Sequence, residues 1–183
     1  MMYVKYILLV IVSLAMDILN YLVAPIVTLF ASEAGWLPKW LWWFQTPDNP
    51  LDGDGGWQQL HRPFKVEDNK FKRWWNRTRW LYRNSAYGFA ISVLGAKTKG
   101  TDTLIIEGNP SVSNRPLTNG LTFRTLYRDN KPIYWQFYYV KAWSSTRCIR
   151  VNLGWKLWGF KKGEDNNLQL THSPNPFMGY SLK

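Results

Sequence analysis

The chain has 183 residues and a formal net charge of +11 at pH 7, and it contains 12 Trp, 10 Tyr and 9 Phe. This length allows one membrane anchor and about 140 further residues, which is enough for one modest soluble core. The single cysteine, Cys148, excludes an internal disulfide framework and is expected to be a small buried hydrophobe. The positive charge favours anionic lipid headgroups or nucleic-acid phosphates as partners.

The first predicted element is an apolar helix within residues 1–35. Residues 6–31 contain one formal charge, Asp17, and at about 1.5 Å per residue they reach roughly 39 Å, more than the roughly 30 Å hydrocarbon core. This run is too long for a signal peptide, and Ser32-Glu33-Ala34 only loosely resembles a cleavage site. The pattern predicts one uncleaved membrane span. The alternatives are a cleaved signal and a kinked interfacial or re-entrant helix, because Pro25 removes a backbone donor.

Polar and small side chains share one face of this predicted helix, because Ser13, Asp17, Asn20 and Ala24 follow one another at spacings of three or four residues. A carboxylate in hydrocarbon costs about 3 kcal/mol on insertion scales, so Asp17 should face protein or water. Small, hydrogen-bonding residues let membrane helices approach closely. We therefore expect this face to bind a second copy of the chain or another membrane helix. The alternative is that a loosely inserted helix simply tolerates Asp17 by tilting.

Residues 36–60 are predicted to form an aromatic interfacial segment followed by a loop rich in Asp, Gly and Pro. Asp48, Asp52, Asp54 and His61 offer oxygen and imidazole groups that suit a divalent cation or an acid–base pair. Their spacing does not fit the helix-loop-helix calcium pattern. The alternatives are carboxylates that bond to their own backbone or pair with the basic helix that follows. No other cofactor is predicted.

Residues 61–100 contain a predicted basic amphipathic helical segment. Between residues 69 and 84, apolar side chains recur at helical spacing and cations fill the remaining circumference. We expect this helix to lie in the headgroup layer. The side chains expected to contact lipid or phosphate are Lys70, Lys72, Arg73, Trp74, Trp75, Arg77, Arg79 and Arg83. Packing on the chain's own sheet is the alternative, and nucleic-acid binding through interleaved Arg and Trp is less favoured.

Residues 101–170 alternate in period two and predict a small antiparallel β domain, with turns at 129–132 and 144–146. In the last predicted strand, Val151 and Leu153 point one way while Arg150 and Asn152 point the other. One face of the sheet is therefore expected to be wet. Residues 171–183 contain two prolines and are expected to form an extended tail. The predicted fold class is α+β.

Three segments together resemble a family of small uncharacterised proteins encoded by tailed bacteriophages. These are residues 44–57 (FQTPDNPLDGDGGW), 79–89 (RWLYRNSAYGF) and 150–160 (RVNLGWKLWGF). The resemblance covers most of the chain and implies a phage origin, with a bacterial host membrane or the virion as the setting. It implies no activity and transfers no functional residue, but it marks residues 46–57 and 83–89 as hallmarks of structure or function.

These patterns predict a membrane-anchored, non-enzymatic phage accessory protein that binds a membrane or protein partner. No catalytic residue is predicted, because no nucleophile–base order or Gly-rich phosphate loop is present. Basic residues beyond the anchor predict the host inner membrane, with a cytoplasmic carboxyl-terminal domain. The alternatives are a minor virion component with a structural or genome-delivery role, and a membrane-bound metal-dependent enzyme acting on lipid or envelope sugar.

Overall fold

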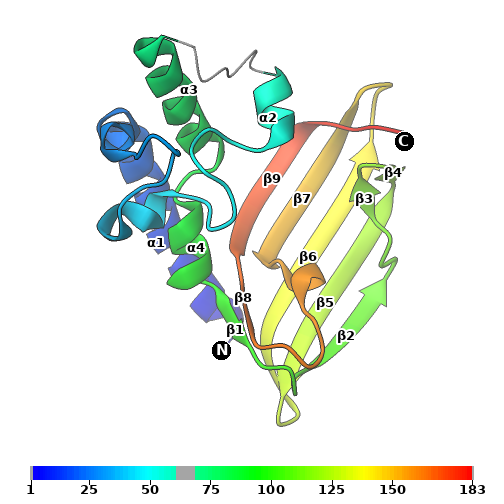
Figure 1. The fold of residues 1–183 in the computed structure, drawn as a ribbon. Helices are drawn as coiled ribbons and strands as arrows, with labels where there is room; N and C mark the ends of the chain where they lie inside the picture. The colour runs from blue at the N-terminus through cyan, green and yellow to red at the C-terminus, as the bar shows by residue number, and fades with distance from the viewer. Residues whose placement is uncertain (1, 61–68, 183) are drawn as a thin grey trace. The chain divides into compact units, whose positions relative to one another are not determined.

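The computed structural model describes residues 2–60 and 69–182, and the chain divides into two compact units (Figure 1). One unit combines the first ten residues with residues 95–183, and the other contains residues 11–94. Helices and antiparallel strands occupy different stretches of the chain, which confirms the α+β class. This division differs from the expected single soluble core, since the helical unit has a hydrophobic cluster of its own.

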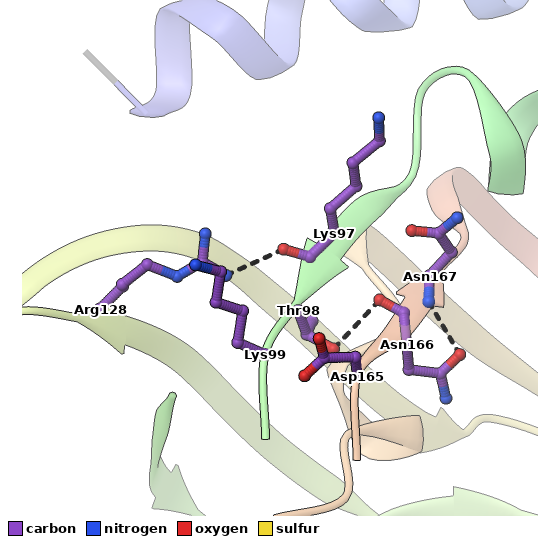
Figure 2. A pocket seen from close by; sticks show the side chains of 7 residues that line it. All are labelled: Lys97, Thr98, Lys99, Arg128, Asp165, Asn166 and Asn167. Carbon is purple, nitrogen blue, oxygen red and sulfur yellow. Dashed lines mark hydrogen bonds between the residues drawn. The ribbon is translucent and has the colours of Figure 1, made fainter. Parts of the chain in front are cut away.

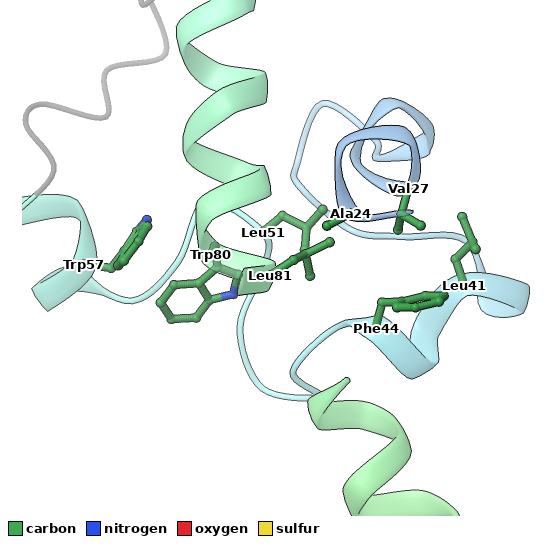
Figure 3. Close-up of a cluster of buried hydrophobic side chains, with 8 residues drawn as sticks. All are labelled: Ala24, Val27, Leu41, Phe44, Leu51, Trp57, Trp80 and Leu81. Atoms are coloured by element: carbon green, nitrogen blue, oxygen red, sulfur yellow. The ribbon is translucent and has the colours of Figure 1, made fainter. Parts of the chain in front are cut away.

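The helical unit is formed mainly by short elements around the long helix α1 (Met2–Val27), which continues into the 3-10 turn η1 (Thr28–Phe30). The other elements are η2 (Lys39–Phe44), α2 (Gly55–Leu60), α3 (Lys70–Arg83) and α4 (Tyr87–Ser92). Its hydrophobic core, drawn in Figure 3, consists of Ala24, Val27, Leu41, Phe44, Leu51, Trp57, Trp80 and Leu81. Burial of these side chains holds α1, η2 and α3 together.

The predicted basic helix is confirmed as α3. Asn69 is its N-cap, and the side chain of Asn69 accepts hydrogen bonds from the backbone N–H groups of Phe71 and Lys72. Apolar side chains at a period of 3.6 residues then place Trp80 and Leu81 in the core. Its apolar face packs on α1, so the alternative in which this face packs on the sheet is wrong.

The other unit is built on a five-stranded antiparallel sheet with the order β2-β5-β6-β7-β9 (Figure 1). The strands are β2 (Thr103–Gly108), β5 (Gly120–Arg128), β6 (Lys131–Ala142), β7 (Arg147–Trp155) and β9 (Leu170–Gly179). Two small ladders accompany it. They are β1 (Ala96–Thr98) with β8 (Asn166–Leu168), and β3 (Ser113–Asn114) with β4 (Leu117–Thr118).

The turn predicted between β5 and β6 is confirmed, since Asp129 and Asn130 have φ angles of 50° and 60°. Two successive positive φ angles suit the right-handed twist of a two-residue hairpin, and Asp and Asn tolerate them well. At the other end of the meander, β7 stops at Trp155 and the 3-10 turn η3 (Leu157–Gly159) follows.

The expectation of an extended tail over residues 171–183 is wrong, because β9 pairs with β7 from Leu170 to Gly179. Pro174 lies opposite Val151 in this pairing. Prolines suggest irregular structure, but an edge strand tolerates them because the missing N–H can face away from the neighbouring strand. The carboxyl-terminal segment is therefore part of the sheet.

Polar side chains on one face of the sheet are buried, which corrects the expectation that the polar face is wet. Thr122, Gln136 and Asn152 share this face and are 0%, 0% and 4% exposed. The Gln136 side chain donates to Asn152 Oδ1 at 2.9 Å and accepts from the backbone N–H of Trp158 at 3.3 Å. The opposite face is also buried in part, since Trp135 and Trp155 are 7% and 0% exposed. The amides of Gln136 and Asn152 are buried with hydrogen-bond partners, which η3 and the neighbouring strand supply.

Two glycines in the segments that carry the resemblance have structural roles. A Cβ atom on Gly88 would lie 2.4 Å from the carbonyl oxygen of Trp42 and 2.6 Å from that of Gln45, so α4 approaches η2 only because this residue is glycine. Gly154 has a φ of 96°, and a Cβ atom there would lie 2.2 Å from the carbonyl oxygen of Trp135. These positions serve backbone packing.

Candidate membrane interface

Each part of the helix α1 is covered on one side by the unit to which it belongs, and apolar side chains remain exposed along the helix. Its buried residues recur at spacings of seven, four and three, which places them on one face; they are Tyr6, Ser13, Asn20, Ala24 and Val27. The opposite face presents exposed apolar side chains, among them Val4, Ile7, Leu8, Ile11, Leu14, Ile18, Leu22, Ile26 and Leu29. The helical stretch Met2–Phe30 is long and apolar enough to cross a membrane. Only 17% of its most apolar window is buried, unlike the core helix of a soluble protein.

The first turns of α1 pack on the sheet of their own unit. The Tyr6 hydroxyl donates to the carbonyl oxygen of Thr171 at 2.9 Å. The Tyr6 ring meets Trp135 and Trp155 edge-on, with centroids 4.9 Å and 5.7 Å apart. Tyr3 adds a tilted contact to Trp135 at 5.3 Å. Aromatic contacts of this kind add to the burial energy, so the start of α1 is part of the folded sheet unit.

The later turns of α1 pack against α3 and the residues after it. The Asn20 amide donates to the carbonyl oxygen of Leu81 at 3.0 Å, and the Trp74 indole donates to that of Pro25 at 2.8 Å. Further contacts join Thr28 to Thr78 through their hydroxyl groups, Tyr21 to Tyr82 by ring stacking, and Ser85 to the carbonyl oxygen of Asp17. Residues later in α1 contact residues earlier in the segment that contains α3, as in the pairs Asn20 with Leu81 and Pro25 with Trp74. The two helices therefore run antiparallel.

These contacts correct the predicted use of the polar stripe. Asn20 and Ala24 are fully buried, and Ser13 is 6% exposed. Asp17 is half-buried and lies beside the Ser85 hydroxyl. Asn20 and Ala24 therefore pack against Leu81 of α3 and its neighbours and are not free to receive a second copy or another membrane helix. The physical reason is the same one that suggested a partner, since small polar residues allow close approach and hydrogen bonding between helices.

Asp52 lies at the centre of a buried ion-pair cluster. The guanidinium of Arg77, which is 7% exposed, donates to both carboxylate oxygens of Asp52 and also to the carbonyl oxygens of Ser32 and Glu33. Arg73 donates to the same carboxylate at 3.0 Å. The loop carboxylate thus pairs with the basic helix, as one of the sequence-based alternatives proposed. Arg73 and Arg77 have protein partners, and the expectation that they contact lipid phosphate is corrected.

The other acidic residues of the loop do not join Asp52 in a cation site. Asp54 accepts a hydrogen bond from the backbone N–H of Trp57 at 2.7 Å and caps α2. Asp48 is exposed, and its charge adds to burial in raising the pKa of Tyr87. His61 lies outside the described residues. Within residues 2–60 and 69–182, no three His, Cys, Asp or Glu side chains are grouped to hold a metal ion.

The remaining cations of α3 divide between its exposed and its packed surface. Lys70 and Lys72 are exposed at the start of the helix beside Trp75, which is 44% exposed. Arg79 and Arg83 lie over the Trp57 ring, with guanidinium-to-centroid distances of 5.7 Å and 5.4 Å. Cation–π contacts of this kind hold the two arginines against α2. The start of α3 is therefore the part that matches the predicted lipid contact best.

An aromatic surface follows the end of α1. Trp36, Trp40, Trp42 and Trp43 are 43–65% exposed. The Trp40 ring meets Phe30 edge-on, with centroids 5.3 Å apart. Such amphipathic rings are enriched where hydrocarbon meets headgroups. The predicted aromatic interfacial segment therefore has the exposure that this role requires.

Cleavage of α1 as a signal sequence conflicts with the core of the helical unit. Ala24 and Val27 belong to the hydrophobic cluster, and Thr28 is 4% exposed against Thr78. Removal of residues 1–31 would take Ala24 and Val27 out of this cluster, together with the adjacent Thr28, and leave a cavity, which would destabilise the helical unit.

One surface depression was missed by sequence reasoning. It lies beside the β1–β8 ladder and the end of β5, has a volume of about 670 Å³, and is lined mainly by Lys97, Lys99, Arg128, Asp165, Asn166 and Asn167 (Figure 2). Three stretches of sequence far apart in the chain contribute to it, so no local motif reveals it. The one local feature of the sequence that indicates a cationic surface here is the pair Lys97 and Lys99, which are two residues apart.

The side chain of Arg128 is fixed beside this depression by Asp102. Its Nε and Nη2 atoms each donate to the Asp102 carboxylate at 2.7 Å. Asp102 is 2% exposed. Hydrogen bonding from Arg128 holds the pKa of Asp102 below its ordinary value, and the same bond raises the pKa of Arg128. Elsewhere in this unit, Cys148 is buried, which confirms the predicted role as a small buried hydrophobe. Burial also raises the pKa of the Cys148 thiol.

The fold and this interface define an α+β protein with an exposed amino-terminal helix that is apolar enough to cross a membrane. The chain belongs to a family described as a family of unknown function, DUF7338, whose model matches residues 1–182. No curated protein and no solved structure matches the chain. The family description gives neither an activity nor an origin, so the phage assignment stays a prediction.

Proposed function

We propose that the protein is a monotopic membrane protein that binds one leaflet through α1 and acts as an anchored, non-enzymatic binding protein. The observation that carries this proposal is the cover along one face of α1 within the helical unit, from Asn20 to Val27. The other face is exposed and apolar over the same length. A helix half-covered by its own protein and half-apolar suits an orientation in the plane of the membrane.

A crossing orientation of α1 is less compatible with the elements that cover it. Because α3 runs beside α1, it would enter the hydrocarbon with Arg77, Arg79 and Arg83. A cation at the bilayer centre costs about 3 kcal/mol on insertion scales. In the plane of the membrane, α3 stays in the headgroup layer or in water and α1 alone contacts the acyl chains. The sequence-based alternative of an interfacial helix is therefore preferred to the single span.

Charge and aromatic residues support the choice of membrane surface. The net charge of +11 favours anionic leaflets, and the exposed tryptophans of η2 suit the headgroup boundary. These properties favour the cytoplasmic leaflet of a bacterial inner membrane, in agreement with the predicted cytoplasmic carboxyl-terminal domain. The proposal differs from the predicted single span in one respect: both ends of α1 remain on the same side of the membrane.

Labelling of single cysteines tests the orientation of α1. In a Cys148→Ala background, the variants Lys5→Cys and Lys39→Cys place a thiol at each end of the apolar segment, at exposed positions. Sealed membrane vesicles from cells that produce each variant are treated with a membrane-impermeant maleimide. Lys162→Cys, at an exposed turn of the sheet unit, reports the side on which that unit lies.

The proposal expects all three thiols to react from the same side of the membrane. Labelling of Lys5→Cys and Lys39→Cys from opposite sides would restore the single span and overturn the in-plane orientation. Absence of the protein from the membrane fraction would instead indicate that another protein covers the exposed face of α1. That result would overturn the membrane role altogether.

A further inference from the structure

We propose that the depression beside the β1–β8 ladder binds the phosphate of an anionic phospholipid headgroup. This inference rests on the proposed membrane association and adds the ligand and the residues that recognise it. The lining supplies cations, amide groups and enough room for a phosphate with a small polar substituent, since the volume is about 670 Å³.

Arg128 provides a fixed donor for the phosphate. Its Nε and Nη2 atoms bind the buried carboxylate of Asp102, and Nη2 also donates to the carbonyl oxygen of Lys97 at 3.0 Å. Within residues 2–60 and 69–182, Arg128 Nη1 makes no hydrogen bond. A guanidinium that is already held in place loses little freedom when it binds an anion, and its charge strengthens each hydrogen bond.

The lining carries an excess of positive charge. Lys97 lies on β1 and Lys99 directly follows the end of that strand; both are exposed. Figure 2 shows the side chains of Lys99 and Arg128 extending toward one another. The carboxylate of the lining, Asp165, accepts a hydrogen bond from the backbone N–H of Gly100 at 2.9 Å. Three cations against one engaged carboxylate favour an anionic ligand.

The position of α1 within the same unit favours a lipid as the source of the phosphate. Lys5, on the second turn of α1, lies over the Tyr134 ring with its Nζ 5.3 Å from the centroid. The Tyr134 hydroxyl accepts a hydrogen bond from the backbone N–H of Lys97 at 3.3 Å. The cations therefore lie beside the turns that expose Ile7 and Leu8 to the membrane. A phosphate at headgroup depth is within reach of all of them.

The test measures binding of the full chain to phosphatidylcholine vesicles with and without phosphatidylglycerol. The double variant Lys97→Gln with Lys99→Gln removes two charges from the depression and leaves the Arg128–Asp102 pair intact. Each lysine near an anionic surface contributes about 1 kcal/mol, so the preference for phosphatidylglycerol should fall about thirtyfold. Binding to pure phosphatidylcholine reports the apolar contact of α1 and should not change.

A matched control removes the same two charges elsewhere in the unit, through Arg115→Gln with Lys141→Gln, both exposed positions outside the depression. The control is expected to keep most of the preference for phosphatidylglycerol. Equal losses in both double variants, or no loss in either, would overturn the site. Binding of glycerol 1-phosphate to the detergent-solubilised chain, abolished by Lys97→Gln with Lys99→Gln while that variant keeps the preference for phosphatidylglycerol vesicles, would identify a soluble phosphate compound and overturn the lipid assignment.

The same assay separates the two proposals. A chain that binds neither kind of vesicle contradicts the membrane function itself. A chain that binds phosphatidylcholine but shows no preference for phosphatidylglycerol contradicts only the headgroup site.

Discussion

Replacement of Asp52 by asparagine should destabilise the helical unit severely. The Asp52 carboxylate receives hydrogen bonds from Arg73 and Arg77, and Arg77 is 7% exposed. Asparagine keeps the shape of the side chain but removes its charge and turns an amide N–H₂ group toward the two guanidinium groups. The arginines would then be left without their counter-ion in a place that water reaches poorly.

The magnitude follows from the geometry of the cluster. Loss of one partner of a buried ion pair costs about 3–5 kcal/mol. The carbonyl oxygens of Ser32 and Glu33 still accept hydrogen bonds from Arg77, which places the expected loss at the lower end, about 3 kcal/mol. For a unit of this size, each 1 kcal/mol corresponds to about 4–8 °C, so the Tm should fall by about 12–24 °C.

Thermal unfolding of the full chain, monitored by tryptophan fluorescence, measures this effect because Trp57 and Trp80 lie in the core of the same unit. Asp48→Asn is the matched control, since it removes the same charge from the same loop at an exposed position. The control should shift the Tm by no more than about 2 °C, as most surface substitutions away from specific contacts do.

Two results would refute this reasoning. Equal shifts for the Asp52 and Asp48 variants would show that the loss reflects loop charge and not the buried pair. A Tm of the wild-type chain that rises with calcium or magnesium, and a loss of that response in Asp52→Asn, would show that the carboxylate holds a cation as the sequence-based alternative predicted.

Two further predictions concern packing and pH. Gly88→Ala should lower the unfolding free energy, measured by chemical denaturation, by about 2–3 kcal/mol, because the new Cβ would collide with the carbonyl oxygens of Trp42 and Gln45. The control Gly55→Ala places its Cβ in open space within a helix and should be neutral or stabilising. Asp102 has a lowered pKa, so its contribution is present above the unfolded-state pKa and is lost as the pH falls below about 4. Circular dichroism should show acid unfolding of the wild-type sheet, and Asp102→Asn should be less stable at neutral pH with a weaker loss below pH of about 4; an unchanged acid transition would contradict this role.

The elements themselves were readable from the sequence because each depends on short-range physics. An apolar run longer than the hydrocarbon core predicts α1, and a period of 3.6 residues predicts α3 between Asn69 and Asn84. Alternating residues and the Asp129-Asn130 turn predict the hairpin of β5 and β6. Propensity, period and turn geometry act within a few residues, so the sequence determines them without reference to the rest of the chain.

The tertiary structure alone decided what covers each face. Periodicity correctly placed Asn20 and Ala24 on one side of α1, but it did not show that α3 covers them. Periodicity likewise separated the two faces of the sheet, yet Gln136 and Asn152 are buried because η3 and neighbouring amides bond them. A pattern reports which side chains share a face, while the partner of that face comes from residues distant in sequence. The division into two units and the cationic depression at Arg128 arise in the same way.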